Sequence, residues 1–191
     1  MKILIATQNK DKVKEFKEIL KGYELVSLND LNDNDDVIED GTTFKENSYI
    51  KAKYYFDKYN LPTFSDDSGI VVDYLKGAPG VYSSRYAGEE CDQPKNRRKV
   101  LKEMIGVEER SARFVCSICY IDKEGNDHYF EGKTEGKILF EELGDNGFGY
   151  DCIFYSTEIN KCFGIASNEE KNAVSHRGRA ARLFANFIEN K

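Results

Sequence analysis

The sequence lacks any apolar run that approaches the roughly 20 residues needed to span a bilayer. Its first residues, Met1–Thr7, turn polar too soon for a secretory leader, so we expect none. It also lacks an excess of basic charge, because 28 Lys and Arg stand against 34 Asp and Glu, for a net charge of −6. A generally basic surface for duplex nucleic acid is therefore excluded. We expect neither a membrane association nor a stable nucleic-acid complex.

Cysteines are few, and their spacing does not predict a metal centre. The five are Cys91, Cys116, Cys119, Cys152 and Cys162, an odd number that argues against a disulfide framework. Cys116 and Cys119 have CxxC spacing, but they lie inside the apolar run 112–121, which is typical of a buried strand. No second CxxC or flanking His accompanies them, so a zinc or redox site is not predicted. A reduced, cytoplasmic protein is expected.

Length and composition are those of an ordinary globular chain. The 191 residues are 40% hydrophobic and 32% charged, which is enough apolar material for a substantial core. We expect a single domain that spans residues 1–191.

A pair of adjacent carboxylates, Asp66-Asp67, organises the chain. Short apolar runs flank the pair, and Ser68-Gly69 follows it, so the pattern predicts a strand, a sharp turn and a second strand. Because successive side chains of a strand point to opposite faces, the two carboxylates have to point apart. One of them could then bind a hard divalent cation together with substrate phosphates. On this stretch alone, a polar turn capped by Asp and Ser is favoured.

The segment Thr7–Lys12 lies between a short apolar strand and an amphipathic helix pattern. A strand, a polar turn and a helix point backbone N–H groups and the positive end of the helix dipole at an anion. Thr7 and Asn9 could hold the turn or donate to phosphate, and Lys12 supplies a charge, although the glycines of a Walker A loop are missing. By itself, the plainer interpretation of Asn9 as a helix N-cap is favoured.

A second helix is predicted to begin at Thr43 and to run to about residue 59. Glu46 stands three residues after Thr43, which matches a capping box. Lys51 lies on this helix and could project into a site. Glu39 and Asp40, just before the helix, are candidate metal ligands.

Further along, the chain predicts a helix over 92–104 and a β-hairpin over 113–140. The last helix is predicted to have Ser175 as its N-cap. His176 and Arg177 then lie in its first turn, where cations oppose the helix dipole, so a ligand is a plausible reason for both.

Glycines punctuate the segment Gly147–Asp151. Glycine permits close backbone approach to a ligand, and Phe148 offers a face on which a flat base could stack. Asp151 could accept hydrogen bonds from a base or a loop amide. The plainer interpretation is a tight turn with one core phenylalanine.

Taken together, these stretches resemble the inosine triphosphate pyrophosphatase family, also called the XTP/dITP diphosphatases. Each motif is weak alone, but jointly they are specific, since they follow the family's order and spacing over nearly the whole chain. The matching motifs are Thr7-x-Asn9-x-x-Lys12, Thr43-Phe44-x-Glu46-Asn47 with Lys51-Ala52, Asp66-Asp67-Ser68-Gly69, Gly77-Ala78-Pro79-Gly80-Val81-Tyr82-Ser83-x-Arg85-Tyr86, Gly147-Phe148-Gly149-Tyr150-Asp151 and Glu170-Lys171-Asn172-x-x-Ser175-His176-Arg177.

The resemblance implies an α/β fold in which an elongated mixed central sheet carries helices, with two lobes flanking a nucleotide-binding cleft. It implies a homodimer and a purine nucleoside triphosphate as substrate. The implied reaction is the Mg²⁺-dependent hydrolysis of deaminated purine nucleotides (ITP, dITP, XTP) to the monophosphate and pyrophosphate. This reaction would cleanse the nucleotide pool, so that such bases are not incorporated into DNA or RNA.

The resemblance also implies a role for each matching residue. Asp67 would be the general base that activates water, and Glu39 and Asp67 would bind the metal. Phe148 would stack on the purine. The residues that would bind the substrate are Thr7, Gln8, Asn9, Lys10, Asp11, Lys12, Lys51, Ser68, Phe148, Gly149, Tyr150, Asp151, Lys171, His176 and Arg177.

Three residues depart from the family's pattern. Gln8 replaces the usual small Gly, and Cys152 replaces the usual Pro. Asp40 stands where many members have Thr, which leaves the choice between Glu39 and Asp40 as the metal ligand open. Two other functions remain as alternatives: a nucleotide-binding module without turnover, and a diphosphatase for other modified nucleotides.

Overall fold

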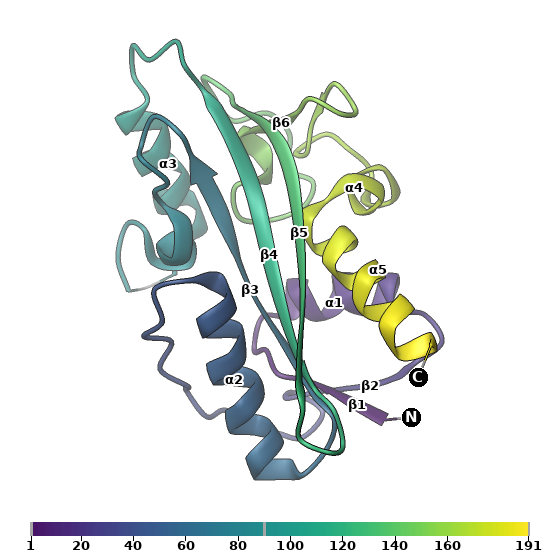
Figure 1. Ribbon diagram of the computed structural model, residues 1–191. Coiled ribbons are helices and arrows are strands. Elements are labelled where there is room, and N and C mark those ends of the chain that lie inside the picture. Colours follow the sequence, from purple (N-terminus) through teal and green to yellow (C-terminus); the bar gives the residue numbers. More distant parts are fainter. Residues whose placement is uncertain (1, 90, 191) are drawn as a thin grey trace. The chain divides into compact units, whose positions relative to one another are not determined.

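The computed structural model describes residues 2–89 and 91–190 (Figure 1). These residues form a seven-stranded sheet in the order β2-β1-β3-β4-β5-β6-β7, with two open ends. The strands are β1 (Lys2–Ile5), β2 (Glu24–Ser27), β3 (Thr63–Val72), β4 (Ser111–Ile121), β5 (Asp127–Ile138), β6 (Phe154–Ser156) and β7 (Lys161–Cys162). The helices are α1 (Lys10–Ile19), α2 (Phe44–Tyr59), α3 (Gln93–Glu103), α4 (Asn168–Val174) and α5 (His176–Glu189), with 3-10 helices η1 (Gly80–Arg85) and η2 (Asp151–Ile153).

The sheet is mixed, as predicted. Strand β1 pairs in parallel with both β2 and β3, whereas β6 pairs antiparallel with both β5 and β7. The predicted α/β fold with a mixed sheet and helices is therefore confirmed.

The chain divides into two compact units, and both are discontinuous in sequence. The first unit comprises residues 1–67, 116–132 and 177–191, and the second comprises 68–115 and 133–176. Four pairs of sequence neighbours are thus assigned to different units, and two of these pairs, Asp67 with Ser68 and His176 with Arg177, belong to the predicted site. The single domain expected over 1–191 stays a prediction.

In the first unit, the alternation of side chains along β1 separates two apolar clusters. Ile3 and Ile5 belong to the cluster that includes Phe16 of α1 and Phe184 of α5. Leu4, which lies between Ile3 and Ile5, packs instead in the cluster that includes Tyr55 of α2. Because a strand presents alternate residues to opposite faces, α1 and α5 cover one face and α2 the other (Figure 1).

Side chains cap the starts of three helices, and the caps of α1 and α2 were predicted. The Asn9 side chain accepts hydrogen bonds from backbone N–H groups in the first turn of α1. Thr43 and Glu46 form the capping box of α2, and Asp92 caps α3. Since each cap satisfies backbone donors that the helix leaves unpaired, these short polar residues determine where the helices begin.

Near the candidate site, one prediction is wrong and the predicted start of the last helix is confirmed. The strand, turn and strand around Asp66-Asp67 are one continuous strand, β3, because buried partners described below hold both carboxylates in the extended chain. The predicted last helix does begin at His176, but a separate short helix, α4, precedes it. Ser175 ends α4 with an extended backbone, at ψ 154°, and so separates the two helices.

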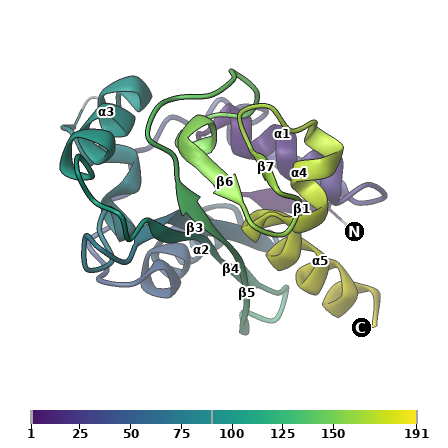
Figure 2. The ribbon, with the colours of Figure 1, turned by 90° about the horizontal axis from the view of Figure 1, so that it is seen from above.

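The second unit has its own core. Ile70 and Val72 of β3 pack with Val100 of α3 and with Phe114 and Phe154 of β4 and β6. Helix α4 lies beside β6 and β7 (Figure 2), where Glu170 accepts a hydrogen bond of 2.6 Å from Lys161.

All five cysteines are free. Cys116 and Cys119 are fully buried in β4, as their apolar surroundings predict. Within the described ranges, no helix combines the length and the apolar character needed to cross a membrane.

Candidate functional site

The carboxylates of Asp66 and Asp67 point to different sets of partners, as the alternation of side chains in β3 predicts. The Asp66 carboxylate lies 3.0 Å from the Lys12 ammonium of α1 and 3.7 Å from Nε of Arg177 in α5. The Asp67 carboxylate accepts a hydrogen bond of 3.1 Å from the Asn47 amide of α2. The first carboxylate therefore faces α1 and α5, and the second faces α2.

The two carboxyl groups are displaced in opposite directions from their ordinary pKa. Burial acts to raise the pKa of Asp66, but the charges of Lys12 and Arg177 outweigh it and hold that pKa far below its usual range. For Asp67 burial dominates and raises the pKa to about 6, although Lys51 and Lys12 act in the opposite direction. Asp66 is thus a permanent anion, whereas Asp67 can exchange a proton close to neutral pH.

Lys51 connects β3 to the segment that precedes α2. Its ammonium donates a hydrogen bond of 2.9 Å to the backbone carbonyl of Asp66 and lies 3.2 Å from the Glu39 carboxylate. Asp40, by contrast, is exposed. Of the two acidic residues between which the sequence left the metal ligand open, Glu39 is the one that contacts this cluster.

The carboxylates of this cluster fit a hard divalent cation. Asp67 and Glu39 supply the oxygen donors that Mg²⁺ prefers, and Oδ1 of Asp66 is buried without a hydrogen-bond partner in the described ranges. Within those ranges no three His, Cys, Asp or Glu residues are arranged to hold a metal by themselves. The ligand set would therefore need oxygens from a phosphate or from water, which is usual for Mg²⁺.

The turn Thr7–Lys12 is held by its own side chains. The side-chain oxygen of Asn9 accepts hydrogen bonds of 2.9 and 3.1 Å from the backbone N–H groups of Asp11 and Lys12. The Thr7 hydroxyl accepts one of 3.2 Å from the backbone N–H of Asn9. Lys10 and Asp11 are exposed, whereas Lys12 turns inward to Asp66. Both roles that the sequence suggested for Asn9, capping the helix and holding the turn, are therefore present.

Gln8 ties this turn to a neighbouring loop. Its side-chain amide donates a hydrogen bond of 2.7 Å to the backbone carbonyl of Asp33. The buried Asp33 carboxylate in turn accepts hydrogen bonds of 2.6 Å from Lys58 and 2.5 Å from Tyr59, both on α2. Burial acts to raise the pKa of Asp33, but these two donors lower it to about 2. The acidic segment 29–36 is thus anchored to α2.

Arg177 is also engaged within the first unit. Besides its contact with Asp66, its guanidinium donates a hydrogen bond to the Glu15 carboxylate of α1, and its side chain is almost completely buried. Neither Glu15 nor Asn47 was predicted to have a role in the site. One signal was available for Glu15, because it lies three residues after Lys12 and therefore on the same face of α1.

In the second unit, Lys171 and Asp151 form a buried ion pair. The Lys171 ammonium lies 2.7 Å from the Asp151 carboxylate, and only 4% of each side chain is exposed. The same carboxylate accepts the backbone N–H of Phe148 at 3.0 Å, and the ammonium lies 5.0 Å from the centroid of the Phe148 ring. Gly147 has a φ of 71°, and a Cβ there would lie 2.1 Å from the Asp151 carboxylate, so this position requires glycine.

The remaining predicted residues of the second unit are engaged with their own surroundings. The His176 ring stacks on Phe114, with centroids 4.7 Å apart. The Tyr150 hydroxyl donates a hydrogen bond of 2.6 Å to the backbone carbonyl of Ser83 in η1, and the Gly149 N–H donates one of 2.9 Å to Gln93. Ser68 is half-buried in β3.

The predicted site residues therefore gather in two clusters, one in each unit. The first-unit cluster consists of the predicted residues Thr7, Gln8, Asn9, Lys12, Glu39, Lys51, Asp67 and Arg177 together with Asp66, and the second-unit cluster consists of Phe148, Gly149, Tyr150, Asp151 and Lys171. One cluster combines cations with titratable carboxylates, and the other combines an aromatic face with a buried ion pair. The first suits a phosphate chain with a metal, and the second suits a flat polar ring.

Because their pKa values are displaced in opposite directions, Asp66 and Asp67 should respond oppositely to amide substitution. The contribution of Asp67 to stability is present below its ordinary pKa of 3.8 and is lost as the pH rises through about 6. Asp67→Asn should therefore raise the free energy of unfolding at pH 8 by about 1–3 kcal/mol, and by little at pH 4. Asp66→Asn should lower it by about 3–5 kcal/mol at pH 8, because Lys12 and Arg177 lose their counter-ion. Urea unfolding in EDTA measures both, and equal losses in the two variants would contradict this account.

The tether from Gln8 to the Asp33 carbonyl predicts coupled motion of the turn and the loop. Gln8→Ala removes one hydrogen bond, worth about 1 kcal/mol, and should speed amide hydrogen exchange in residues 7–12 and 29–36 about fivefold. Lys10→Ala is the control, since Lys10 is exposed in the same turn. Exchange that rises equally in both variants would show that the tether does not order the turn.

Comparison with known proteins agrees with this geometry. Over 94% of its length the chain is 47% identical to a protein of Clostridium perfringens named "dITP/XTP pyrophosphatase", of which it covers 93%. A Desulfotalea psychrophila protein of the same name is 48% identical over 93% of this chain and 81% of its own. The solved structure of the Staphylococcus aureus Ham1 protein superposes with a TM-score of 0.90 at 37% identity, covering 100% of this chain and 99% of that one. The sequence model of the Ham1 family matches residues 3–187. The resemblance found in the motifs is thereby confirmed, and the chain belongs to the Ham1 family.

Proposed function

We propose that this protein hydrolyses deaminated purine nucleoside triphosphates (ITP, dITP and XTP) to the monophosphate and pyrophosphate, with Mg²⁺ as cofactor. The observation that carries the proposal is the first-unit cluster, in which Lys12 contacts the Asp66 carboxylate and Lys51 its backbone carbonyl, while the next residue, Asp67, is a buried carboxyl group whose pKa is raised to about 6. The names of the relatives in Clostridium perfringens and Desulfotalea psychrophila support the same reaction. Its consequence in the cell would be the removal of such nucleotides before they are incorporated into DNA or RNA.

The chemistry asked of the chain is mainly positioning and charge neutralisation. Lys12 and Lys51 would offset the negative charge of the triphosphate, and the turn Thr7–Lys12 would present its N–H groups to it. Glu39 and Asp67 would hold the divalent cation, which when bound supplies further neutralisation of the phosphate charge. Asp66 would keep Lys12 and Arg177 in place, because its own low pKa makes it a constant counter-ion.

Asp67 would act as the general base. The oxygen of a water molecule forms a bond to the α-phosphorus, and the bond between that phosphorus and the bridging oxygen to the β-phosphate breaks. The proton of the water passes to the Asp67 carboxylate, and pyrophosphate leaves. A carboxyl group with a pKa of about 6 is mostly ionised at neutral pH and is a stronger base than an exposed aspartate.

The base would be recognised by the residues implied by the resemblance. Phe148 offers a face for stacking, and Lys171 and His176 are buried groups of the same unit that can donate hydrogen bonds. Hypoxanthine and xanthine carry a 6-oxo acceptor where adenine has an amino donor. A buried donor left unpaired opposite adenine would cost about 1–3 kcal/mol. Guanine shares the 6-oxo group, so its rejection must depend on its 2-amino group.

The remaining features belong to the same proposal: a homodimer, both units acting as one domain over 1–191, and a cytoplasmic location. The free state of all five cysteines supports a reducing compartment.

A substrate panel tests the reaction. With Mg²⁺, the purified protein should release pyrophosphate from ITP, dITP and XTP at least about tenfold faster than from ATP, given the cost of an unpaired donor. Asp67→Asn should lower kcat by about 100-fold or more, as expected for loss of a general base. Release of orthophosphate, or full activity in Asp67→Asn, would refute the mechanism. Tight nucleotide binding without turnover would instead favour a binding module, and preference for modified pyrimidine or methylated nucleotides would favour a related diphosphatase.

The two neighbouring acids before α2 provide a matched test of the metal site. Glu39→Gln should raise the Mg²⁺ concentration needed for half-maximal activity about tenfold or more, because the residue contributes a charged oxygen next to Lys51. Asp40→Asn removes the same charge one residue further on, from an exposed side chain, and should change that concentration less than about twofold. The reverse pattern would reassign the ligand to Asp40.

A further inference from the structure

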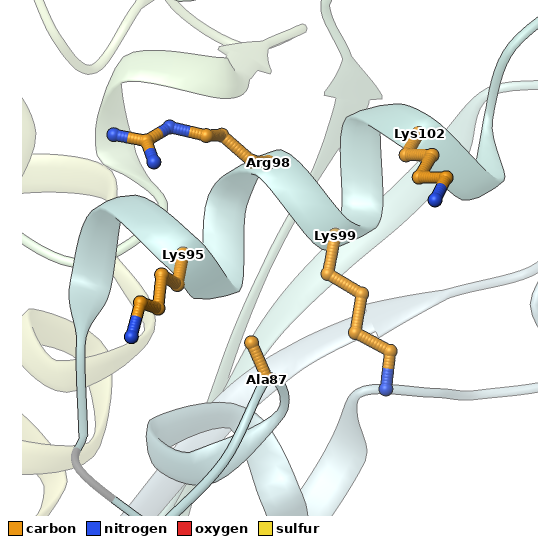
Figure 3. A pocket seen from close by; sticks show the side chains of 5 residues that line it. All are labelled: Ala87, Lys95, Arg98, Lys99 and Lys102. Carbon is orange, nitrogen blue, oxygen red and sulfur yellow. The ribbon is translucent and has the colours of Figure 1, made fainter.

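Helix α3 presents a row of cations that the two clusters described above do not use. Lys95, Arg98, Lys99 and Lys102 line, together with Ala87, a surface hollow of about 500 Å³ in the second unit. In Figure 3, Lys95 and Lys99 extend from the helix on the side of Ala87, and Arg98 extends from its other flank. The four cations occupy positions i, i+3, i+4 and i+7, so they are attached along one side of the helix, although the Arg98 side chain is directed away from Ala87.

This arrangement is electrostatically unfavourable in the absence of a partner. Residues three and four apart on a helix are neighbours, and like-charged neighbours destabilise it. Lys95 is also in the first turn of α3, where a cation opposes the helix dipole. Since the whole chain carries a net charge of −6, the cluster is not part of a generally basic surface.

The cations of α3 differ in how many partners their side chains have. Arg97 donates hydrogen bonds of 3.0 Å to both the Glu142 carboxylate and the Gly149 carbonyl. The carboxylate of Asp92 lies 3.9 Å from the ammonium of Lys95, in a pair of exposed side chains. Lys99 donates a hydrogen bond of 2.8 Å to the Tyr86 carbonyl. Neither Arg98 nor Lys102 makes a side-chain hydrogen bond or an ion pair with the described part of the chain.

We propose that the hollow beside α3 binds a chain of phosphoryl groups, such as linear polyphosphate or the triphosphate tail of a nucleotide. The four cations span seven residue steps, about 10 Å along the helix axis, which exceeds the reach of a single phosphate. The described lining residues include no carboxylate that would repel the chain. They also include no aromatic side chain, and the nearby Tyr86 ring is covered by the Lys99 ammonium at 4.1 Å. Because single-stranded nucleic acids are bound by basic grooves with aromatic stacking platforms, a phosphate chain is favoured over a nucleic-acid strand.

Backbone amide NMR of the full-length, metal-free protein tests the proposal, because it locates the ligand on the sequence. Titration with sodium tripolyphosphate in EDTA should shift the amides of Ala87 and residues 93–103 in a saturable way. The affinity should fall as NaCl is raised from about 50 to about 300 mM, since exposed charges are screened. Equal affinities for tripolyphosphate and ATP would identify the nucleotide tail as a sufficient source, and a tighter tripolyphosphate complex would favour the inorganic chain.

Two triple variants separate local from general charge. Changing Lys95, Arg98 and Lys102 to Gln should weaken tripolyphosphate binding at α3 about tenfold or more. Changing the exposed Lys2, Lys123 and Lys137 to Gln removes the same charge elsewhere and should leave the affinity within about twofold. Both variants should retain pyrophosphate release from ITP, so a failure here is distinct from a failure of the proposed function.

Three results would overturn the proposal. Shifts confined to Thr7–Lys12 and Lys51 would place all phosphate binding in the first-unit cluster. If tripolyphosphate shifted the α3 amides of the Lys95, Arg98 and Lys102 variant as much as those of the unmodified protein, these three cations would not bind the ligand. Shifts produced by a 12-residue oligothymidylate but not by tripolyphosphate would assign the face to nucleic acid.

Discussion

The burial of Asp66 between two cations is the interaction on which the first-unit cluster depends. A carboxylate taken out of water in the middle of a strand is costly unless charges and hydrogen bonds replace its hydration. Lys12 from α1 and Arg177 from α5 supply the charges, and Glu15 takes up the other side of the Arg177 guanidinium. The ion pairs thereby connect β3 to two helices that are distant in sequence. They also fix the direction of Lys12, the last residue of the turn Thr7–Lys12, whose side chain is 14% exposed.

In the neighbouring residue, Asp67, the effect of burial on the carboxyl group outweighs that of the charges around it. Its side chain points to α2, where the hydrogen bond comes from the neutral amide of Asn47 and the ammonium of Lys51 is directed at Glu39 and a backbone carbonyl. Burial therefore prevails over charge, and the pKa rises to about 6. A buried carboxyl group whose ionisation lowers the stability of the folded protein is typical of functional sites, where reactivity is retained at the expense of stability. The two carboxyl groups of β3 thus differ: one is a constant counter-ion, and the other has a pKa of about 6.

Local rules predicted those parts of the fold in which neighbours in sequence are also neighbours in space. The caps at Asn9 and Thr43, the buried strand around Cys116 and the alternation of Asp66 and Asp67 all follow from residues within a few positions of one another. The turn expected at Ser68-Gly69 failed because partners from α1, α2 and α5 hold the polar residues in an extended strand. Glu15 and the anchoring of Asp33 were missed for the same reason, since their partners lie 162 and 25 positions away. The family motifs single out residues from distant parts of the chain, such as Lys12 and Arg177, because they carry the outcome of such distant contacts without showing the contacts themselves.

Gln8 illustrates how a departure from a family pattern can be absorbed by the structure. Where the family usually has glycine, this chain has a long amide side chain that reaches the carbonyl of Asp33 instead of filling the turn. The contact is useful only if the loop that carries Asp33 is itself fixed, and the short hydrogen bonds from Lys58 and Tyr59 to its carboxylate provide that anchor. A glycine at position 8 would leave the turn free to adjust to a ligand, whereas the glutamine orders it beforehand and lowers the entropy lost on binding. The substitution therefore changes how the turn is prepared for an anion, and leaves the N–H groups and the Lys12 charge that would hold one in place.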